Sequence, residues 1–534
     1  MHIDLRIFIV FNKIHALKEE LILEIIKKNI IINRPVKCGT TEISTDCDII
    51  VPDVKPDILK ILQVDGTAVV RNTELLEGRL LADGIIRLNI LYLPDREDEK
   101  IKAIETYSEF STRIDKGEIM PDMQVFVEAL VEKIDFQVLN SRKLRVKTTV
   151  KIDYEVSEQA MIELAEGIED EEAEICVTPI ELISLVDLKH SSFSVREDFE
   201  LPPGHSAVEE ILKSDVSICD TEYKIVGERA VVKGTLCLSC LYLDTSGCIK
   251  SCDFETAFTE IFDLAEADDD TVCDISYFVK DLSLRAEADS DGDMRTLASE
   301  CEIGVRIVAT RKVETEILVD CFYPGKKTEI EKSSVELEKM VSSGFYQTTV
   351  REIVSAPAAC PNILGIYNVF ATLNVEKTEV LNNSVCVSGN VSCCILYISD
   401  SEETPVYSMK KNFPFNMTID TPGSESSMDC SIDVKLVHTS FSLNPANEAE
   451  IRCILSASAR VFERNNVEII DEIFISEPDE NQVKGIVLYF VQKNESLWDI
   501  SKRYFVSQKE ILSVNNLEDD AVIKEGMRLL IPTA

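Results

Sequence analysis

The stretch Gly84-Ile-Ile-Arg-Leu-Asn-Ile-Leu-Tyr92 decides the fold, because its pattern returns twice further along the chain. It returns as Gly234-Thr-Leu-Cys-Leu-Ser-Cys-Leu-Tyr242 and again as Gly389-Asn-Val-Ser-Cys-Cys-Ile-Leu-Tyr397. Each copy is a glycine, seven further residues and a tyrosine inside an apolar run. A period near 150 residues is too long for a solenoid unit, so the pattern predicts three β-rich units in series.

Apolar residues around this signature keep nearly constant spacing. Ile58 and Ile363 each precede their tyrosine by 34 residues, and Ile211 precedes its tyrosine by 31. Phe110 and Phe415 each follow their tyrosine by 18 residues. Because independent anchors agree, the match indicates a true threefold repeat rather than a chance pairing of glycine with tyrosine.

The remainder of each repeat is typical of β-structure. Residues 125–131 and 144–154 alternate or run apolar and are rich in Val, Thr and Tyr, which favours strands. Polar turn residues recur at one place in each repeat, at 140–143, 289–293 and 444–447. The expected fold class is therefore mainly β, with three tandem, sandwich-like repeats followed by a small βααβ module.

Composition gives the expected domain boundaries. The acidic run at 166–174 has too few apolar residues to bury a core, and it predicts a linker. We also expect a helix over 17–28 and a helical turn over 55–62. The predicted segments are a lead segment at 1–29, repeats at 30–158, 176–326 and 333–475, linkers at 159–175 and 476–483, and the last module at 484–534.

Charge excludes several classes of partner. The 534 residues include 96 acidic and 55 basic ones, which gives a formal net charge of −41. Binding to phosphates needs a basic surface, so we expect no nucleic-acid partner and no docking on an anionic membrane. The chain has no apolar run of about 18 residues, so we also expect no membrane insertion.

The cysteines and the first residues predict a cytoplasmic protein. The 17 cysteines are an odd number spread over most of the chain, which is typical of reduced thiols in a reducing compartment. The apolar run at 7–11 is shorter than the core of a secretory signal. We therefore expect all cysteines to be reduced.

No catalytic, metal-binding or cofactor-binding set is expected. Cys237 and Cys240 have the spacing of a zinc ribbon, but three residues apart on one strand they point to opposite faces. We expect Cys240 to be the more buried thiol. The EF-hand-like start at Glu287 has Ala298 at its twelfth position, so a hairpin turn explains it. Phosphate-binding loops and nucleophile elbows are absent from the sequence, so an enzyme is not expected.

The last 51 residues differ from the repeats in charge and pattern. A short strand over 487–491 is followed by Ser496, whose hydroxyl is placed to cap a helix. A capping box over 507–510 opens a second helix, and Gly526 turns the chain into a closing strand. The order of elements is therefore βααβ.

This module resembles a LysM domain through 489–504, Val506-Ser507, Asn515-Asn516-Leu517 and Ile531-Pro532. The segment Val51-Pro-Asp-Val-Lys-Pro-Asp-Ile58, together with the three repeats, resembles the SPOCS domains of SipL-type spore-morphogenesis proteins. Three SPOCS-like repeats with one terminal LysM module are similar to the SipL-type architecture.

The LysM resemblance implies a groove for N-acetylglucosamine polymers between two loops. Asn494-Glu495 stands where the family has Gly-Asp; asparagine tolerates a left-handed backbone, whereas the longer Glu495 side chain crowds a sugar. The alternative is that these residues serve only turns and packing. Trp498 is either an exposed anchor for a partner or a core or half-buried residue. The groove positions implied are Asn494, Glu495, Ser496, Leu497, Asn516, Leu517 and Ile523, with Trp498 beside them.

The SipL resemblance implies an adaptor in the mother-cell cytosol, at the forespore surface, that joins a coat-morphogenesis ATPase. Two functions therefore remain open. The module docks a protein partner, or it binds peptidoglycan with the repeats as a spacer. The missing secretory signal and the free thiols favour the first.

Overall fold

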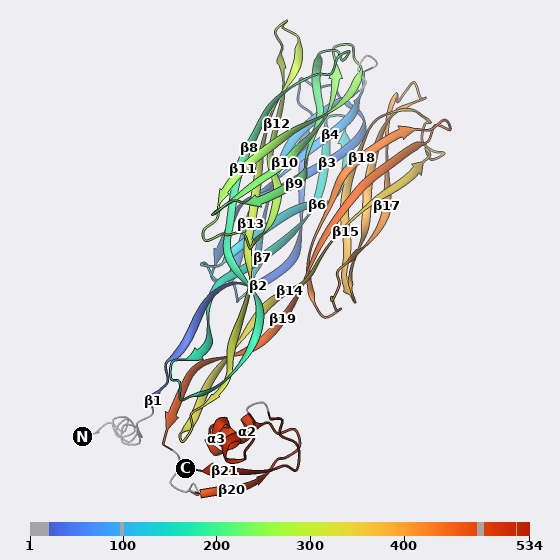
Figure 1. The fold of residues 1–534 in the computed structure, drawn as a ribbon. Coiled ribbons are helices and arrows are strands. Elements are labelled where there is room, and N and C mark those ends of the chain that lie inside the picture. Colours follow the sequence, from blue (N-terminus) through green and yellow to red (C-terminus); the bar gives the residue numbers. More distant parts are fainter. Residues whose placement is uncertain (1–20, 97–100, 478–484, 519–520, 534) are drawn as a thin grey trace, which may run out of the picture.

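The computed structural model describes residues 21–96, 101–477, 485–518 and 521–533. Most of the lead segment predicted at 1–29 and most of the linker predicted at 476–483 lie outside these ranges. Most of the described residues are in antiparallel strands, and the described helices are confined to the last module. The prediction of a mainly β chain is confirmed (Figure 1).

Each repeat consists of two three-stranded antiparallel sheets that pack face to face. In the first repeat these sheets are β3 (Ile58–Leu76), β4 (Arg79–Pro94) and β5 (Lys102–Asp115), and β2 (Ile25–Ile50), β7 (Lys143–Ile168) and β6 (Gln124–Asn140).

The other repeats copy this arrangement. The second contains β9 (Val208–Ile225), β10 (Arg229–Asp244) and β11 (Ile249–Asp263), and β8 (Glu174–Glu200), β13 (Met294–Phe322) and β12 (Thr271–Ala288). The third contains β15 (Ile363–Leu381), β16 (Ser384–Ser399) and β17 (Val406–Asp420), and β14 (Lys327–Val354), β19 (Ala449–Ser476) and β18 (Asp429–Leu443), with β1 (Leu21–Ile22) added beside β19.

The signature glycines and tyrosines hold equivalent places in the three repeats. The glycines lie on the central strands β4, β10 and β16, where the register pairs each with a phenylalanine, as Gly84–Phe110, Gly234–Phe258 and Gly389–Phe415. All three tyrosines are fully buried near the ends of the same strands. The threefold repeat is confirmed. Sequence reasoning missed Phe258 because the β10–β11 connection is shorter, which moves it to 16 residues after its tyrosine.

The three repeats share buried cores and are not separate units. Six strands of 26–29 residues (β2, β7, β8, β13, β14 and β19) extend past the sandwiches into one narrow bundle, which we call the stalk (Figure 1). Its core draws on all three repeats, with Ile30, Ile32, Ile162, Leu164, Leu182, Ile317, Leu337 and Ile469 in one cluster. A second shared core joins the other sheets, through Leu62, Leu91, Leu212, Leu241, Leu396 and Val406.

The acidic linker predicted over 159–175 is mostly strand. β7 runs to Ile168, a turn follows, and β8 begins at Glu174. Ile162 and Leu164 are buried in the stalk, whereas Met161 and Glu163 face solvent. The period-2 alternation of a strand was therefore hidden by the high content of acidic residues.

Three local predictions need correction. Residues 21–28 of the helix expected over 17–28 are extended except for a short break, because β-branched isoleucines from Ile25 onward pair with β7. The helical turn expected over 55–62 is a short loop that ends where β3 begins at Ile58. The four-residue loop expected at 140–143 is a two-residue turn, Ser141-Arg142.

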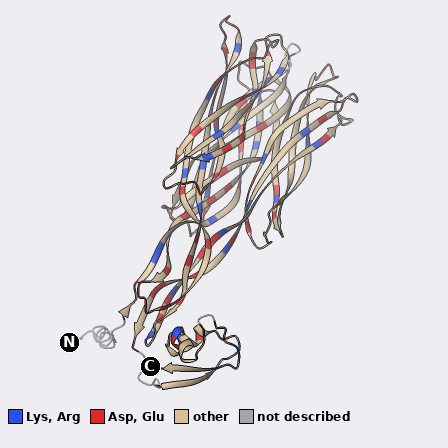
Figure 2. Ribbon diagram, viewed as in Figure 1, with Lys and Arg blue, Asp and Glu red and all other residues tan. Residues whose placement is uncertain are grey.

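Charged residues of both signs are mixed along the strands of every repeat (Figure 2). No helix in the described ranges is both long and apolar enough to span a bilayer. Cys240 is fully buried and Cys237 is half-buried, as their opposite orientations predicted. The acidic loop after Glu287 is a hairpin turn in which Asp289 Oδ1 accepts the backbone N–H groups of Asp291 and Asp293, both at 3.0 Å.

Candidate partner-binding site in the C-terminal module

The last module has the predicted βααβ order and a core of its own. Its elements are β20 (Gly485–Phe490), α2 (Leu497–Tyr504), α3 (Gln508–Val514) and β21 (Arg528–Thr533). The two strands pair antiparallel, and the helices pack on one face of the pair. Its buried core consists of Val491, Ile500, Val506, Ile511, Leu529 and Ile531.

The first predicted loop keeps the turn but redirects its acidic side chain. Asn494 has φ 60°, the left-handed conformation that asparagine tolerates. The Glu495 carboxylate is folded inward, where it accepts hydrogen bonds from the Tyr489 hydroxyl (2.8 Å) and the Gln492 backbone N–H (3.0 Å) and pairs with Arg503 at 2.7 Å. Burial alone would raise the pKa of Glu495, but these three partners lower it. Glu495 is therefore a bracing residue and does not project over a groove.

The next predicted residue, Ser496, caps the start of helix α2. Ser496 Oγ accepts the Asp499 backbone N–H at 3.1 Å, and Asp499 Oδ2 accepts the Ser496 backbone N–H at 2.9 Å. These reciprocal bonds form a capping box that opens α2. At α3 the Ser507 hydroxyl accepts the Glu510 backbone N–H at 3.2 Å. Both helix starts lie where the sequence predicted them.

In the second predicted loop, two of the three predicted residues pack against the module core and one is exposed to solvent. Leu517 and Ile523 pack against the module core, as Leu497 does from the first loop. Asn516 has φ 51° and is exposed, and so are Asn494 and Ser496. The structure thus gives packing or hydrogen-bonding contacts to Glu495, Leu497, Leu517 and Ile523 and a capping role to the exposed Ser496, and it leaves Asn494 and Asn516 exposed to solvent.

Trp498 faces the stalk. Its Nε1–H donates to Asp320 Oδ2 at 2.9 Å, and its ring lies edge-on to Phe322 with centroids 5.1 Å apart. Lys502 Nζ pairs with the other Asp320 oxygen, and Gly325 N–H donates to the Phe505 carbonyl at 2.7 Å. Burial alone would raise the pKa of Asp320, but the bonds from Lys502 and Trp498 lower it. Helix α2 therefore holds the module against β13 and the turn that follows it.

The opposite face of the module is apolar and exposed. Ile486, Leu488 and Phe490 alternate along β20 and are 50–67% exposed, and Leu530 lies directly across from Leu488 on β21. Sequence reasoning did not single out this face because both sides of the strand 486–490 are apolar. The sequence did contain a signal for this face. Helices cover only one face of the two-stranded sheet, so a strand that is apolar on both sides must leave one side exposed.

The contact between α2 and the stalk gives a testable expectation. Asp320→Ala removes the acceptor of two charged or polar donors, so the module is expected to detach more readily, at a cost of about 1–3 kcal/mol. Hydrogen exchange of the Gly325 amide, which donates to the Phe505 carbonyl of the module, is expected to accelerate. Glu316→Ala, on an exposed part of the same strand, is the control. Equal exchange in the two variants would show that Asp320 does not hold the module.

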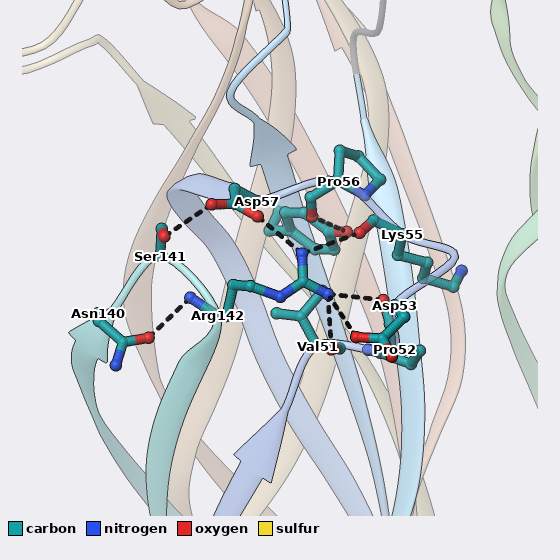
Figure 3. Close-up of polar contacts among 10 residues, drawn as sticks. Val51, Pro52, Asp53, Lys55, Pro56, Asp57, Asn140, Ser141 and Arg142 are labelled. Carbon is teal, nitrogen blue, oxygen red and sulfur yellow. Dashed lines mark hydrogen bonds and ion pairs between the residues drawn. The ribbon is translucent and has the colours of Figure 1, made fainter.

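The Pro-Asp motif of the first repeat has a structural role (Figure 3). The Arg142 guanidinium donates to the carbonyls of Val51 and Pro52, both at 3.0 Å, and to Asp57 Oδ1 at 2.7 Å. The buried Tyr92 hydroxyl donates to the Pro56 carbonyl at 3.0 Å. Hydrogen bonds from Ser141 and Arg142 lower the pKa of Asp57. The motif thus ties the loop between the two sheets to the signature tyrosine.

The signature tyrosines of the other repeats also contact this loop, with the equivalent partner in the third repeat and a different one in the second. Tyr397 donates to the Pro361 carbonyl at 3.0 Å. Tyr242 instead meets the ring of His205 at 2.8 Å, and Arg295 donates to the His205 carbonyl. The tyrosine is therefore the residue that contacts the loop between the two sheets in all three repeats.

Comparison with known families agrees with this division of the chain. The family model for the SipL SPOCS domain matches residues 57–139, 207–287 and 362–444. The family model for the LysM domain matches residues 489–532. The searches found no matching curated protein and no matching solved structure.

Proposed function

The chain is a SipL-type protein with three SPOCS domains and a C-terminal LysM domain, and from this we propose that it is a non-enzymatic scaffold in spore coat assembly. In this proposal it acts in the mother-cell cytoplasm at the forespore surface. Its LysM module docks a coat-morphogenesis ATPase. SPOCS and LysM domains are non-catalytic families, which supports a scaffold.

The observation that carries docking through the LysM module is the exposed apolar face of β20 and β21. Four large apolar side chains, those of Ile486, Leu488, Phe490 and Leu530, lie uncovered on a module of about 50 residues. Contiguous exposed apolar side chains are typical of protein-binding surfaces. The helix side of the module is occupied by the stalk, so the sheet side is the surface presented outward. The exposed loop residues Asn494, Ser496 and Asn516 are proposed to extend the contact.

Peptidoglycan binding is the second candidate. It is supported by the left-handed conformation of Asn494, a conformation that glycine adopts readily, at the position where the family has glycine, and by the inward orientation of Glu495, which leaves the loop uncrowded. The two candidates use different chemistry. A glycan is bound by polar loop groups, whereas a protein partner buries the apolar face.

The experiment compares Leu488→Asp in the full chain with Val54→Asp, an equally drastic change at an exposed valine of the first repeat. Burying an unpaired carboxylate is strongly unfavourable, so Leu488→Asp is expected to weaken capture of the ATPase at least about 10-fold, with unchanged circular dichroism. Sedimentation with insoluble peptidoglycan is measured in parallel. Retained ATPase capture by Leu488→Asp would contradict the proposed surface. Sedimentation of the parent chain with peptidoglycan, without capture of the ATPase, would favour the second candidate.

A further inference from the structure

Two cysteines of the second repeat have their sulfur atoms in contact. Cys219 on β9 and Cys237 on β10 are both half-buried, and their Sγ atoms are 3.0 Å apart. Register places Cys219 opposite Thr235 and Cys237 opposite Ser217, so the two cysteines are diagonal neighbours on one face of the sheet. Only a small approach of the sulfurs separates this arrangement from the S–S bond length of a disulfide, about 2.05 Å.

We propose that Cys219 and Cys237 form a thiol–disulfide modification site, at which a low-molecular-weight disulfide oxidises the chain to an intrachain cross-link between β9 and β10. In the first step the thiolate of one cysteine attacks a sulfur of the small disulfide, forms a mixed disulfide and releases one small thiolate. In the second step the other cysteine attacks the protein sulfur of the mixed disulfide and releases the second small thiolate. The protein loses two hydrogens and the small disulfide gains them.

The surroundings set the order of the two steps. Burial and the neighbouring Cys219 raise the pKa of Cys237 to about 12, which makes Cys237 the poorer attacking thiol. Cys219 lies on β9, at the edge of the three-stranded sheet. Cys219 is therefore the residue that takes the small thiol first, and Cys237 resolves the mixed disulfide.

Other neighbouring thiols lack this access. Cys240 and Cys252 are direct cross-strand partners, but they are 0% and 6% exposed. Cys393 and Cys453 are both fully buried inside the third sandwich. A small disulfide must reach its target sulfur in line with the S–S bond, so these core pairs are expected to stay reduced under conditions that oxidise Cys219 and Cys237.

The cross-link would stabilise the second repeat. It closes a loop that includes the β9–β10 turn, and closing such a loop lowers the entropy of the unfolded chain. The oxidised protein is therefore expected to unfold at a Tm a few degrees higher than the reduced one. A reversible change of this kind would let the redox state of the surroundings set the rigidity of the repeat.

The test treats the folded full chain with oxidised glutathione and then maps its peptides by mass spectrometry. The expected result is a loss of two hydrogens, a linked peptide pair containing Cys219 and Cys237, and reversal by dithiothreitol. Cys219→Ser is expected to abolish the link, whereas Cys248→Ser, at an exposed cysteine of the same repeat, is expected to leave it intact. A persistent glutathione adduct on Cys219 without the link, or a link between other cysteines, would overturn the proposal.

Discussion

Gly389→Ala is expected to destabilise the third repeat by about 3 kcal/mol or more. A Cβ atom at this position would lie 2.1 Å from the backbone carbonyl oxygen of Asn374 and 3.0 Å from the ring of Phe415. The carbonyl belongs to the adjacent strand β15, so it can move only if the strand pairing opens. Gly389 is therefore required by the close approach of neighbouring backbone and not by its φ angle.

Urea unfolding of a matched series measures this effect. Gly234→Ala is expected to cost less than Gly389→Ala, because the nearest atoms its Cβ would meet belong to the side chain of Phe258, which can shift. Gly117→Ala is the control, since nothing lies within 4 Å of its added Cβ. Equal stability of the Gly389 and Gly117 variants would show that the signature glycine is not needed for packing.

Lys213→Met is expected to lower the free energy of unfolding by about 2–3 kcal/mol at neutral pH. Lys213 is only 7% exposed, and its ammonium pairs with Asp65 of the first repeat and with Asp215 of its own repeat. The same group lies 4.9 Å from the centre of the Phe370 ring in the third repeat. Lys213 thus stands where the three repeats meet. Methionine keeps the aliphatic stem but leaves Asp65, whose side chain is 31% exposed, without its cation.

The cost of losing Lys213 is expected to depend on pH. Burial raises the pKa of Asp65, against the opposing effect of Lys213. A carboxyl with a raised pKa contributes stability below its unfolded pKa and loses that contribution as pH rises through its folded pKa. Without Lys213 this loss is larger, so the destabilisation should grow from about pH 5 to about pH 8.

Chemical unfolding at both pH values checks this expectation. Lys224→Met, at an exposed position of the same strand, is the control and is expected to stay within about 0.5 kcal/mol of the parent. Adding Asp65→Asn to Lys213→Met should recover part of the loss. If Lys213→Met behaves like the control, the ion pair does not stabilise the contact between repeats.

The repeats could be predicted from the sequence because the residues that define them are constrained locally. A glycine is needed where it pairs with a phenylalanine on the next strand, and a tyrosine is needed to hydrogen-bond the loop between the two sheets. Such constraints fix spacing within one repeat, and spacing is visible in a sequence. The place of Phe258 in the repeat was missed because the lengths of the loops between strands vary freely. A shorter loop changes the number of residues between the tyrosine and Phe258 without changing the strand pairing.

The stalk and the contact between the module and the stalk could not be predicted, since both depend on contacts between segments far apart in the chain. Trp498 and Asp320 are 178 residues apart in the chain, and the sequence around either residue does not indicate a contact with the other. In the stalk, each strand contributes only a few alternating isoleucines and leucines to a core built from three repeats. The LysM loops were predicted as a binding site from resemblance, and the structure shows that Leu497, Leu517 and Ile523 also pack the core.

In the proposed function the LysM module docks the coat-morphogenesis ATPase, and the acidic repeats do not replace it. The most direct measurement is the dissociation constant of the purified ATPase for the full chain and for a chain lacking residues 484–534. The module has its own core, so its removal leaves the sandwich cores of the repeats complete. The affinity is expected to fall at least about 100-fold on deletion. Unchanged affinity of the shortened chain would contradict the proposed function.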